Sequence, residues 1–302
     1  MGLSRRALCL LLFLGVAWGL PYLLIKVAVR EFEPATLVLV RSVVGAVLLC
    51  PAALRRPLGR VSKSQAAWVA AFAFVEIAGP YLLLADAERS LPSTTTAVVV
   101  ALTPAVAFAI SACMGDRRHV RAAQLLGLVT GAAGVAAVAG GAGPSAGPLA
   151  LGEAFLAVVG YAAGPQIAAR RLQGLPGPAL AAVSLALTAV VFSPAAARWP
   201  AHPTSGPVLA ALGLASLCTA AALAALFALI SEIGPARPAV ITYINPAVAA
   251  LAGVLVLGEP MTVPLGCGML AIVAGSWLTA SDPLTRSRSP LAPGAMEALP
   301  RG

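Results

Sequence analysis

The sequence predicts an all-α integral membrane protein with ten transmembrane helices, arranged as two five-helix repeats of inverted topology. Three observations support this fold class: an apolar composition, a series of helix-length apolar segments and an internal duplication. Of the 302 residues, 60% are hydrophobic and only 10% are charged, and the mean hydropathy is +0.93. A soluble domain has about 45–50% apolar and about 25% charged residues, so most of this chain is expected to lie within a bilayer.

Apolar segments run through the whole chain, each near the ~20 residues that a helix needs to cross ~30 Å of hydrocarbon. Their boundaries carry proline, glycine or charged residues, which are typical of turns and loops. Residues 1–6 are expected to form a cytoplasmic N-terminus, and the polar tail 281–302 is expected to be disordered in the cytoplasm. The expected helices span residues 7–29, 35–54, 66–85, 93–114, 122–140, 149–169, 179–197, 206–230, 237–257 and 261–280.

An internal duplication organises these segments. The pentapeptide TPAVA at 103–107 recurs as NPAVA at 245–249, and MGD at 114–116 recurs as LGE at 257–259, with nearly the same spacing between the copies. A near-constant offset indicates two copies of a unit of about 140 residues, expected here as five-helix repeats at 7–140 and 149–280. Because each unit holds an odd number of helices, the second copy is expected to insert upside down relative to the first.

Lys and Arg residues are divided unequally between the two sides of this topology. Fifteen fall in loops or termini on one side, whereas only Arg30, Arg89 and Arg198 fall on the other. Cytoplasmic loops of membrane proteins are enriched in Lys and Arg. The bias predicts a multi-pass protein of the cell membrane with both termini in the cytoplasm. It also accounts for the net charge of +9 without nucleic-acid binding.

Several other functional classes lack their motifs in this sequence. The five cysteines show no paired spacing, and His119 and His202 fall in loops, so neither a disulfide framework nor a metal site is expected. No GxxxxGK[ST] phosphate loop is present, which excludes direct ATP drive by this chain. No cofactor is expected.

Three charged residues fall within apolar segments or near their ends: Arg41, Glu76 and Lys26. A charge at the bilayer centre costs ~2.5–3.5 kcal/mol even on insertion scales, so each needs a partner or a function. For Glu76, three interpretations remain open: carrying a coupling proton, pairing with a substrate amine and pairing with Arg41. Arg41 is expected to have a gating or structural role, and Lys26 is expected to snorkel to the outer interface.

Two prolines, Pro104 and Pro246, occupy equivalent places in the repeat, near the centres of their expected helices. A proline inside a helix leaves the carbonyl four residues earlier without its hydrogen bond, here at Val100 and Thr242. In a bilayer such a carbonyl must find another partner or line a wet cavity. A kink satisfied by a neighbouring helix and a substrate-facing break therefore both remain open, and both prolines are candidates for a gating or structural role.

A set of residues along the chain resembles the EamA-type branch of the drug/metabolite transporter superfamily. These residues are Trp18, Gly19, Pro21, Pro34 and Arg41, the TP and MGD of the fourth helix, and the stretch GPARPAVITYINPAVAALAGVLVLGEPMT at 234–262. The resemblance covers residues 7–280, and one departure from it is Asp116 in place of the usual Glu. It implies two inverted EamA domains that export or exchange small metabolites, including amino acids and their relatives.

The resemblance also implies that the first, sixth and ninth helices contribute to a central cavity. With Glu76 from the third helix, the candidate substrate-binding residues are Trp18, Glu76, Tyr161, Gln166, Tyr243 and Asn245. Interfacial anchoring and helix capping account for Tyr81 and for the threonines at 94–96.

The sequence thus predicts a secondary transporter, expected to export small organic metabolites or drugs by alternating access rather than to act as an enzyme. Its expected partners are a small-molecule solute and the lipid bilayer, with protons as a candidate coupling ion and a homodimer as a candidate assembly. Two alternatives remain: an integral membrane enzyme and a non-transporting membrane scaffold. The enzyme would need convergent catalytic groups at depth, and the sequence has no HExxH motif, no acidic pair and no buried histidine.

Overall fold

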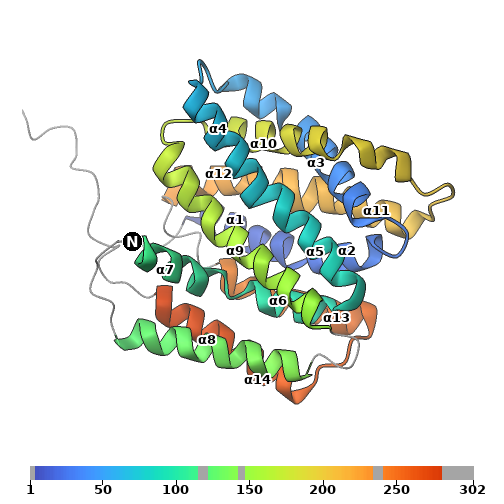
Figure 1. Ribbon diagram of the computed structural model, residues 1–302, viewed down its shortest axis with the longest axis vertical. Helices are drawn as coiled ribbons and strands as arrows, with labels where there is room; N and C mark the ends of the chain where they lie inside the picture. The colour runs from blue at the N-terminus through green and yellow to red at the C-terminus, as the bar shows by residue number, and fades with distance from the viewer. Residues whose placement is uncertain (1–3, 115–121, 142–146, 234–240, 281–302) are drawn as a thin grey trace, which may run out of the picture.

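The computed structural model describes residues 4–114, 122–141, 147–233 and 241–280, which fold into helices with no strand among them. Figure 1 shows the helices running roughly along one direction and packing side by side. In the first half, the helical rods are α1–α2 (Arg5–Gly19 and Pro21–Ala28), α3 (Pro34–Arg55), α4–η1–α5 (Lys63–Phe72, Ala73–Ala78 and Gly79–Ser90), α6–α7 (Ser93–Val100 and Thr103–Cys113) and α8 (Ala122–Gly141).

The second half repeats this arrangement of rods, with short connections between them. Its rods are α9 (Pro148–Arg171), α10 (Gly177–Val191) with the 3₁₀ turn η2 (Ser193–Arg198), α11–η3–α12 (Ser205–Ala215, Ser216–Ala221 and Ala222–Ile233), α13 (Ile241–Leu257) and α14 (Val263–Ala280). Among the described residues, six helical rods are long and apolar enough to cross a membrane, and four more are apolar but shorter.

The outer surface of the bundle suits lipid rather than water. Large apolar side chains are widely exposed, including Leu149 at 77%, Leu255 at 78% and Val263 at 79%. Soluble monomers rarely expose contiguous apolar patches of large size. Together with the apolar rods, this surface identifies a multi-pass membrane protein.

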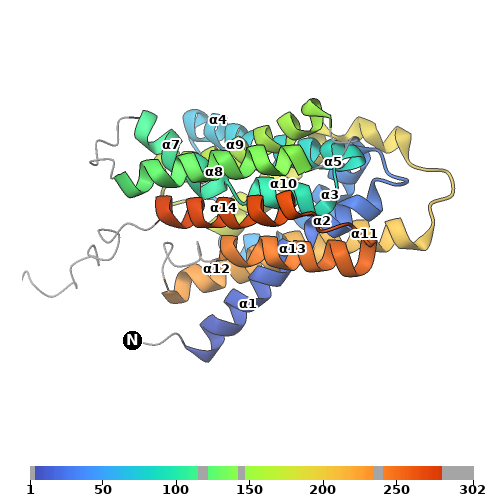
Figure 2. The ribbon, with the colours of Figure 1, turned by 90° about the horizontal axis from the view of Figure 1, so that it is seen from below.

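The packing pattern is the same when the two halves are exchanged. α3 packs against α10, and α8 packs against α14, so each of these pairs joins corresponding helices. α1 packs against α13. In the other half, α9 corresponds to α1, and it packs against α6 and α7, which together correspond to α13. α5 packs against α9, and the corresponding rod α11–α12 packs against α1 and α2. Figure 1 shows α8 and α14 along one edge, with α3 and α10 near the opposite edge; Figure 2 shows α1 crossing beneath the other helices.

Glycines allow the closest of these contacts, between α8 and α14. A Cβ built on Gly134 would lie 2.8 Å from the Gly268 carbonyl oxygen, and one on Gly268 would lie 2.7 Å from the Gly134 carbonyl oxygen. A Cβ on Gly275 would lie 2.5 Å from the Gly127 carbonyl oxygen. Small residues let helix backbones approach each other within membranes, so the glycines hold these two helices together by packing.

The most unexpected local structure is a π-helical turn in the third helix of each half. The two turns, η1 (Ala73–Ala78) and η3 (Ser216–Ala221), fall at corresponding positions of the two repeats. π turns are rare and occur often at functional sites, because they interrupt the α-helical hydrogen-bond ladder and reorient side chains. Hydropathy does not distinguish a π turn from an α turn, so neither turn was expected from the amino-acid pattern.

Helix boundaries differ from expectation where they affect function. The third rod continues to Ser90 rather than ending at residue 85, and the seventh helix ends at Val191 before the short turn η2. The first rod breaks between Gly19 and Pro21. The fourth breaks after Val100, so that Pro104 lies in the first turn of α7 instead of mid-helix.

Candidate functional site

The centre of the bundle holds an arginine without an acidic partner among the described residues. Arg41, on α3, is only 6% exposed. Its Nε donates a 2.7 Å hydrogen bond to Thr219 Oγ1 in η3, and its guanidinium carbon lies 3.5 Å from the centre of the Tyr81 ring. Thr219 Oγ1 in turn donates to the carbonyl oxygen of Leu214 at 3.0 Å. The hydroxyl proton is therefore committed to the backbone, which leaves a lone pair of the oxygen for Arg41.

Glu76 occupies the place in η1 that Thr219 occupies in η3, at the corresponding position of the repeat. Its Oε2 is buried and has no hydrogen-bond partner. The carboxyl lies against Gly164 of α9, where a Cβ would collide with Glu76 Oε2 and would lie 2.7 Å from its Cβ. Arg41 directs its guanidinium to Thr219 and Tyr81, so the interpretation in which Glu76 pairs with Arg41 is wrong.

Tyr161 of α9 belongs to the same region, because α9 packs against η1, which carries Glu76, and against α5, which carries Tyr81. We call five residues the central polar layer: Arg41 of α3, Glu76 of η1, Tyr81 of α5, Tyr161 of α9 and Thr219 of η3. Tyr81 was expected at the outer interface, but it is 8% exposed and lies beneath the arginine, so that expectation is wrong.

Ser184 of α10 stands at the repeat position that Arg41 holds in α3. Its hydroxyl oxygen is buried without a hydrogen-bond partner. α10 packs against η1 as α3 packs against η3. The two halves thus place different chemistry at equivalent positions: a bonded Arg–Thr pair in one, and an unpartnered hydroxyl and carboxyl in the other.

Two candidate substrate-binding amides join helices at equivalent interfaces. Gln166 Nε2 on α9 donates to the Ala107 carbonyl of α7 at 3.2 Å, and its Oε1 accepts from Ser111 at 3.3 Å. With its amide oriented so that the nitrogen faces carbonyl oxygens, Asn245 on α13 donates to Gly15 at 3.1 Å and to Ile241 at 3.0 Å. Each amide therefore connects an inner helix to its neighbour from the other half of the chain.

The remaining candidates have other surroundings. Trp18 is half-buried and packs with apolar residues of α1, α12 and α13. Tyr243 belongs to α13, and its side chain lies outside the described residues, as does Asp116. Pro246 is buried within α13.

The carbonyl oxygen that was expected to be freed by Pro104 has a partner. Thr103 Oγ1 donates to the Val100 carbonyl oxygen at 2.6 Å. The helix also breaks at this point, with Leu102 N–H bonded to the Val99 carbonyl. The local hydroxyl therefore gives the Val100 carbonyl a hydrogen-bond partner within its own segment.

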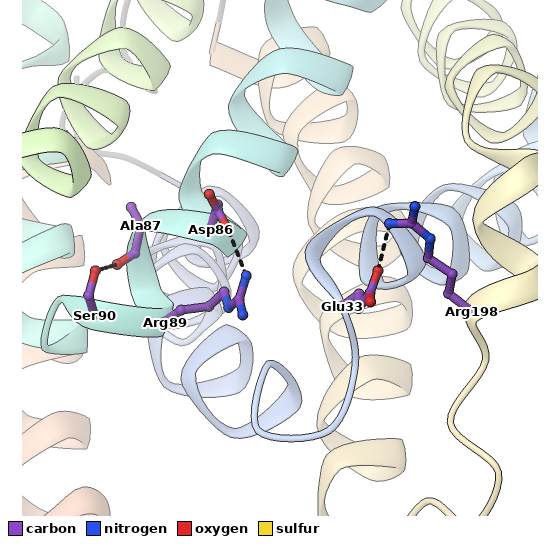
Figure 3. Close-up of polar contacts among 6 residues, drawn as sticks. All are labelled: Glu33, Asp86, Ala87, Arg89, Ser90 and Arg198. Atoms are coloured by element: carbon purple, nitrogen blue, oxygen red, sulfur yellow. Dashed lines mark hydrogen bonds and ion pairs between the residues drawn. The ribbon is translucent and has the colours of Figure 1, made fainter.

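A pocket of about 430 Å³ opens at the end of the bundle where α3 begins and α5 ends. We call it the vestibule. Two ion pairs stand at its mouth, Glu33–Arg198 at 3.0 Å and Asp86–Arg89 at 3.3 Å, as Figure 3 shows. Its wall includes Leu82, which follows Tyr81 in the chain. Its lining residues are Glu33, Pro34, Ala35, Leu82, Leu83, Asp86, Arg89, Glu153 and Arg198.

Glu88 was not among the charged residues expected inside the bundle. Because α5 extends to Ser90, Glu88 lies inside the bundle at 0% exposure, and neither carboxyl oxygen has a hydrogen-bond partner. Lys26, Glu259 and Arg41 act on it electrostatically. Lys26, which was expected to snorkel to the outer interface, directs its Nζ to the end of α5 and donates to the carbonyl oxygens of Glu88 at 2.7 Å and Leu91 at 2.8 Å.

Glu259 caps the first turn of α6 from the other half of the chain. Its carboxylate accepts hydrogen bonds from the N–H groups of Ser93 at 2.7 Å and Thr94 at 2.9 Å, and from the Thr94 hydroxyl at 2.8 Å. The threonines at 94–96 lie in the first turn of α6 and are buried, with at most 1% exposure. Gly253 leaves room for the cap, because a Cβ there would lie 2.8 Å from Glu259 Oε2.

We expect Glu259→Ala to lower the free energy of unfolding by about 1–3 kcal/mol, because buried N–H donors of α6 lose a charged acceptor. Glu33→Ala is the control, since it removes an exposed ion pair at the same end of the bundle and should cost less than about 1 kcal/mol. Thermal unfolding in detergent measures both. An unchanged melting temperature for Glu259→Ala would show that the cap adds no stability.

The opposite end of the bundle has its own contacts between helices. The Ser4 hydroxyl donates to Glu232 of α12, and Arg6 lies 3.8 Å from the same carboxylate. The Arg171 guanidinium of α9 lies 4.8 Å from the centre of the Trp68 ring of α4. No cluster of three or more His, Cys, Asp or Glu residues suited to a metal occurs in the described ranges.

Comparisons with known proteins identify the fold and the family. No curated protein matches the chain. One solved structure, titled only "Crystal structure of protein", has a TM-score of 0.64 and 20% sequence identity, and the match covers 95% of this chain and 100% of that one. This likeness shows a shared fold. The profile of the EamA-like transporter family matches residues 5–140 and 149–281, one copy for each half of the described bundle. The chain is therefore a member of the EamA-like transporter family.

Proposed function

We propose that the protein is a secondary transporter of the cell membrane that exports small organic metabolites, amino acids or related compounds, by alternating access. The observation that carries this proposal is the central polar layer, in which both halves contribute polar groups from π turns at equivalent positions. Polar and charged groups inside a bilayer are costly and commonly mark a substrate or ion pathway. A site between two related halves can be exposed to either side when one half moves against the other.

The proposed topology has ten spans, inverted repeats at 7–140 and 149–280, and both termini in the cytoplasm. Its support is the bias of Lys and Arg together with the grouping of residues at the two ends of the bundle. Arg89 and Arg198, two of the three cations expected outside, line the vestibule. Arg6 lies at the opposite end with Glu232.

Flux through purified protein in liposomes tests the proposal. Liposomes preloaded with unlabelled amino acids would receive an external mixture of ¹⁴C-labelled amino acids, and protein-free liposomes are the control. We expect counterflow several-fold above the control. Absence of flux in a preparation that stays folded would contradict the proposal. Chemical conversion of a solute by the protein in detergent, without flux in liposomes, would favour the membrane enzyme. Absence of both conversion and flux would favour the non-transporting scaffold.

A further inference from the structure

Arg41 is a buried cation for which the described residues provide no anion. Its side chain is among the few charged ones in the interior, at 6% exposure, yet no described carboxylate lies within ion-pair distance of it. An unpaired charge removed from water is costly unless another group compensates it. The Tyr81 ring face and the Thr219 hydroxyl are attractive to a cation but carry no charge. The compensation is therefore incomplete.

The contacts of Arg41 orient its guanidinium and leave its two terminal nitrogens without a partner among the described residues. Nε is occupied by Thr219 at 2.7 Å, and the guanidinium carbon lies 3.5 Å from the centre of the Tyr81 ring. Nη1 and Nη2 make no hydrogen bond to any described residue. Two parallel N–H groups of a guanidinium match the two oxygens of a carboxylate or phosphate. Arg41 thus presents a pre-oriented pair of donors.

The nearest acidic candidate within the described chain does not serve this pair. Glu88 is close enough for an electrostatic effect from Arg41, but both of its oxygens lack a hydrogen-bond partner, so they do not reach the guanidinium. Glu76 does not serve it either, because Arg41 directs its guanidinium to Thr219 and Tyr81. An anion that arrives from outside the protein would be the first to pair with Arg41.

The vestibule lies beside the segment that carries Tyr81: its lining includes Leu82, the next residue in the chain, but neither Tyr81 nor Arg41. Within the lining Arg89 pairs with Asp86 and Arg198 pairs with Glu33, and Glu153 is a third carboxylate. Passage of a solute from the vestibule to Arg41 belongs to the proposed transport, in which one half moves against the other.

From these observations we infer that Arg41, held by Thr219 and Tyr81, binds the oxyanion group, carboxylate or phosphate, of the solute. The inference rests on the proposed function, because it assigns a substrate class to the same central polar layer. It predicts discrimination by charge: the site accepts an acid and rejects the amide of the same shape, because a neutral amide leaves the guanidinium uncompensated.

Binding to wild-type protein in nanodiscs tests this directly by calorimetry with three matched probes: benzoate, phenyl phosphate and benzamide. We expect benzoate or phenyl phosphate to bind at least about tenfold more tightly than benzamide, which corresponds to about 1.4 kcal/mol. A preference for benzoate identifies a carboxylate site, and a preference for phenyl phosphate identifies a phosphate site. Equal affinity for all three probes, or no binding of either anion, would overturn the inference. This test needs no variant.

Variants locate the effect. Arg41→Gln should abolish the preference for the anion, and Arg41→Lys should weaken anion binding about tenfold because an ammonium lacks the paired donors. Arg30→Gln is the matched control, since it removes an exposed cation at the vestibule end of the bundle. This variant should bind the probes as wild type does. Wild-type anion affinity in folded Arg41→Gln would overturn the inference.

The two proposals fail in different ways. If labelled amino acids cross the membrane, but the affinity for the probes depends neither on their charge nor on Arg41, the proposed transport stands and the oxyanion site is wrong. If benzoate or phenyl phosphate binding depends on Arg41 but no labelled amino acid moves above the protein-free control, the site stands and the proposed amino-acid transport is wrong.

Discussion

Gly164→Ala is expected to destabilise the protein, whereas Gly152→Ala on the same helix is expected to stabilise it. At Gly164 the added methyl would collide with the Glu76 carboxyl, which already lies against this position. Overpacking of this kind typically costs about 1–3 kcal/mol. At Gly152 a Cβ would meet nothing within 4 Å, so the gain in helix propensity, up to about 1 kcal/mol, should remain.

Thermal unfolding of the two variants in the same detergent gives the comparison. Opposite signs are the expected result, and Gly164→Ala should also slow flux because Glu76 must move to make room. If both substitutions shift the melting temperature equally, α9 and η1 are not in the close contact described here.

Glu76→Gln is expected to abolish flux driven by a pH gradient while counterflow exchange continues. Two interpretations of Glu76 remain, proton carriage and pairing with a substrate amine; we propose the first, because its Oε2 is buried without a partner in the central polar layer. Glutamine has nearly the same shape but cannot gain or lose a proton near neutral pH. The transporter would then still exchange solute for solute and would lose its coupling to protons.

Glu232→Gln is the matched control, because it changes a carboxylate at the end of the bundle opposite the vestibule and should keep gradient-driven flux. Glu88→Gln examines the rival buried carboxyl. If Glu88→Gln removes the pH-gradient dependence and Glu76→Gln keeps it, the proton carrier is Glu88 and the role proposed for Glu76 is wrong.

The helical architecture was predictable because its causes are present in the sequence. Apolar composition requires helices in a bilayer, since backbone groups there must be satisfied within the segment. The recurrence of TPAVA as NPAVA located the duplication, and the family match covers both copies. The π turns were not predictable, because a segment can have the same hydropathy and composition in a π turn and in an α turn.

The central polar layer was predictable only in part. Arg41 and Glu76 stood out because charges at depth are costly. Glu88 was missed because the end of its helix was placed before it, at residue 85, although α5 continues to Ser90. Tyr81 was assigned to the interface because its position along a helix does not reveal which way its ring points. Its contact with Arg41 depends on tertiary packing.

The two amide candidates illustrate the same limit. Gln166 and Asn245 were recognised as polar residues on helices expected to line a cavity. In the structure each donates to a carbonyl oxygen of a neighbouring helix, Ala107 and Gly15 respectively. A polar residue inside a membrane needs a partner, and the sequence alone does not show whether that partner is a solute or a backbone carbonyl.

Access to Thr219 from the two sides of the membrane tests the central claim most directly. Thr219→Cys would be placed in a protein whose five native cysteines are replaced, and an impermeant methanethiosulfonate would be applied to right-side-out and inside-out vesicles. Arg30→Cys and Arg60→Cys serve as the outer and inner references. Alternating access predicts labelling of the position at Thr219 from both sides, with each reference labelled from one side only. Labelling at Thr219 from a single side, with both references behaving as expected, would contradict the account.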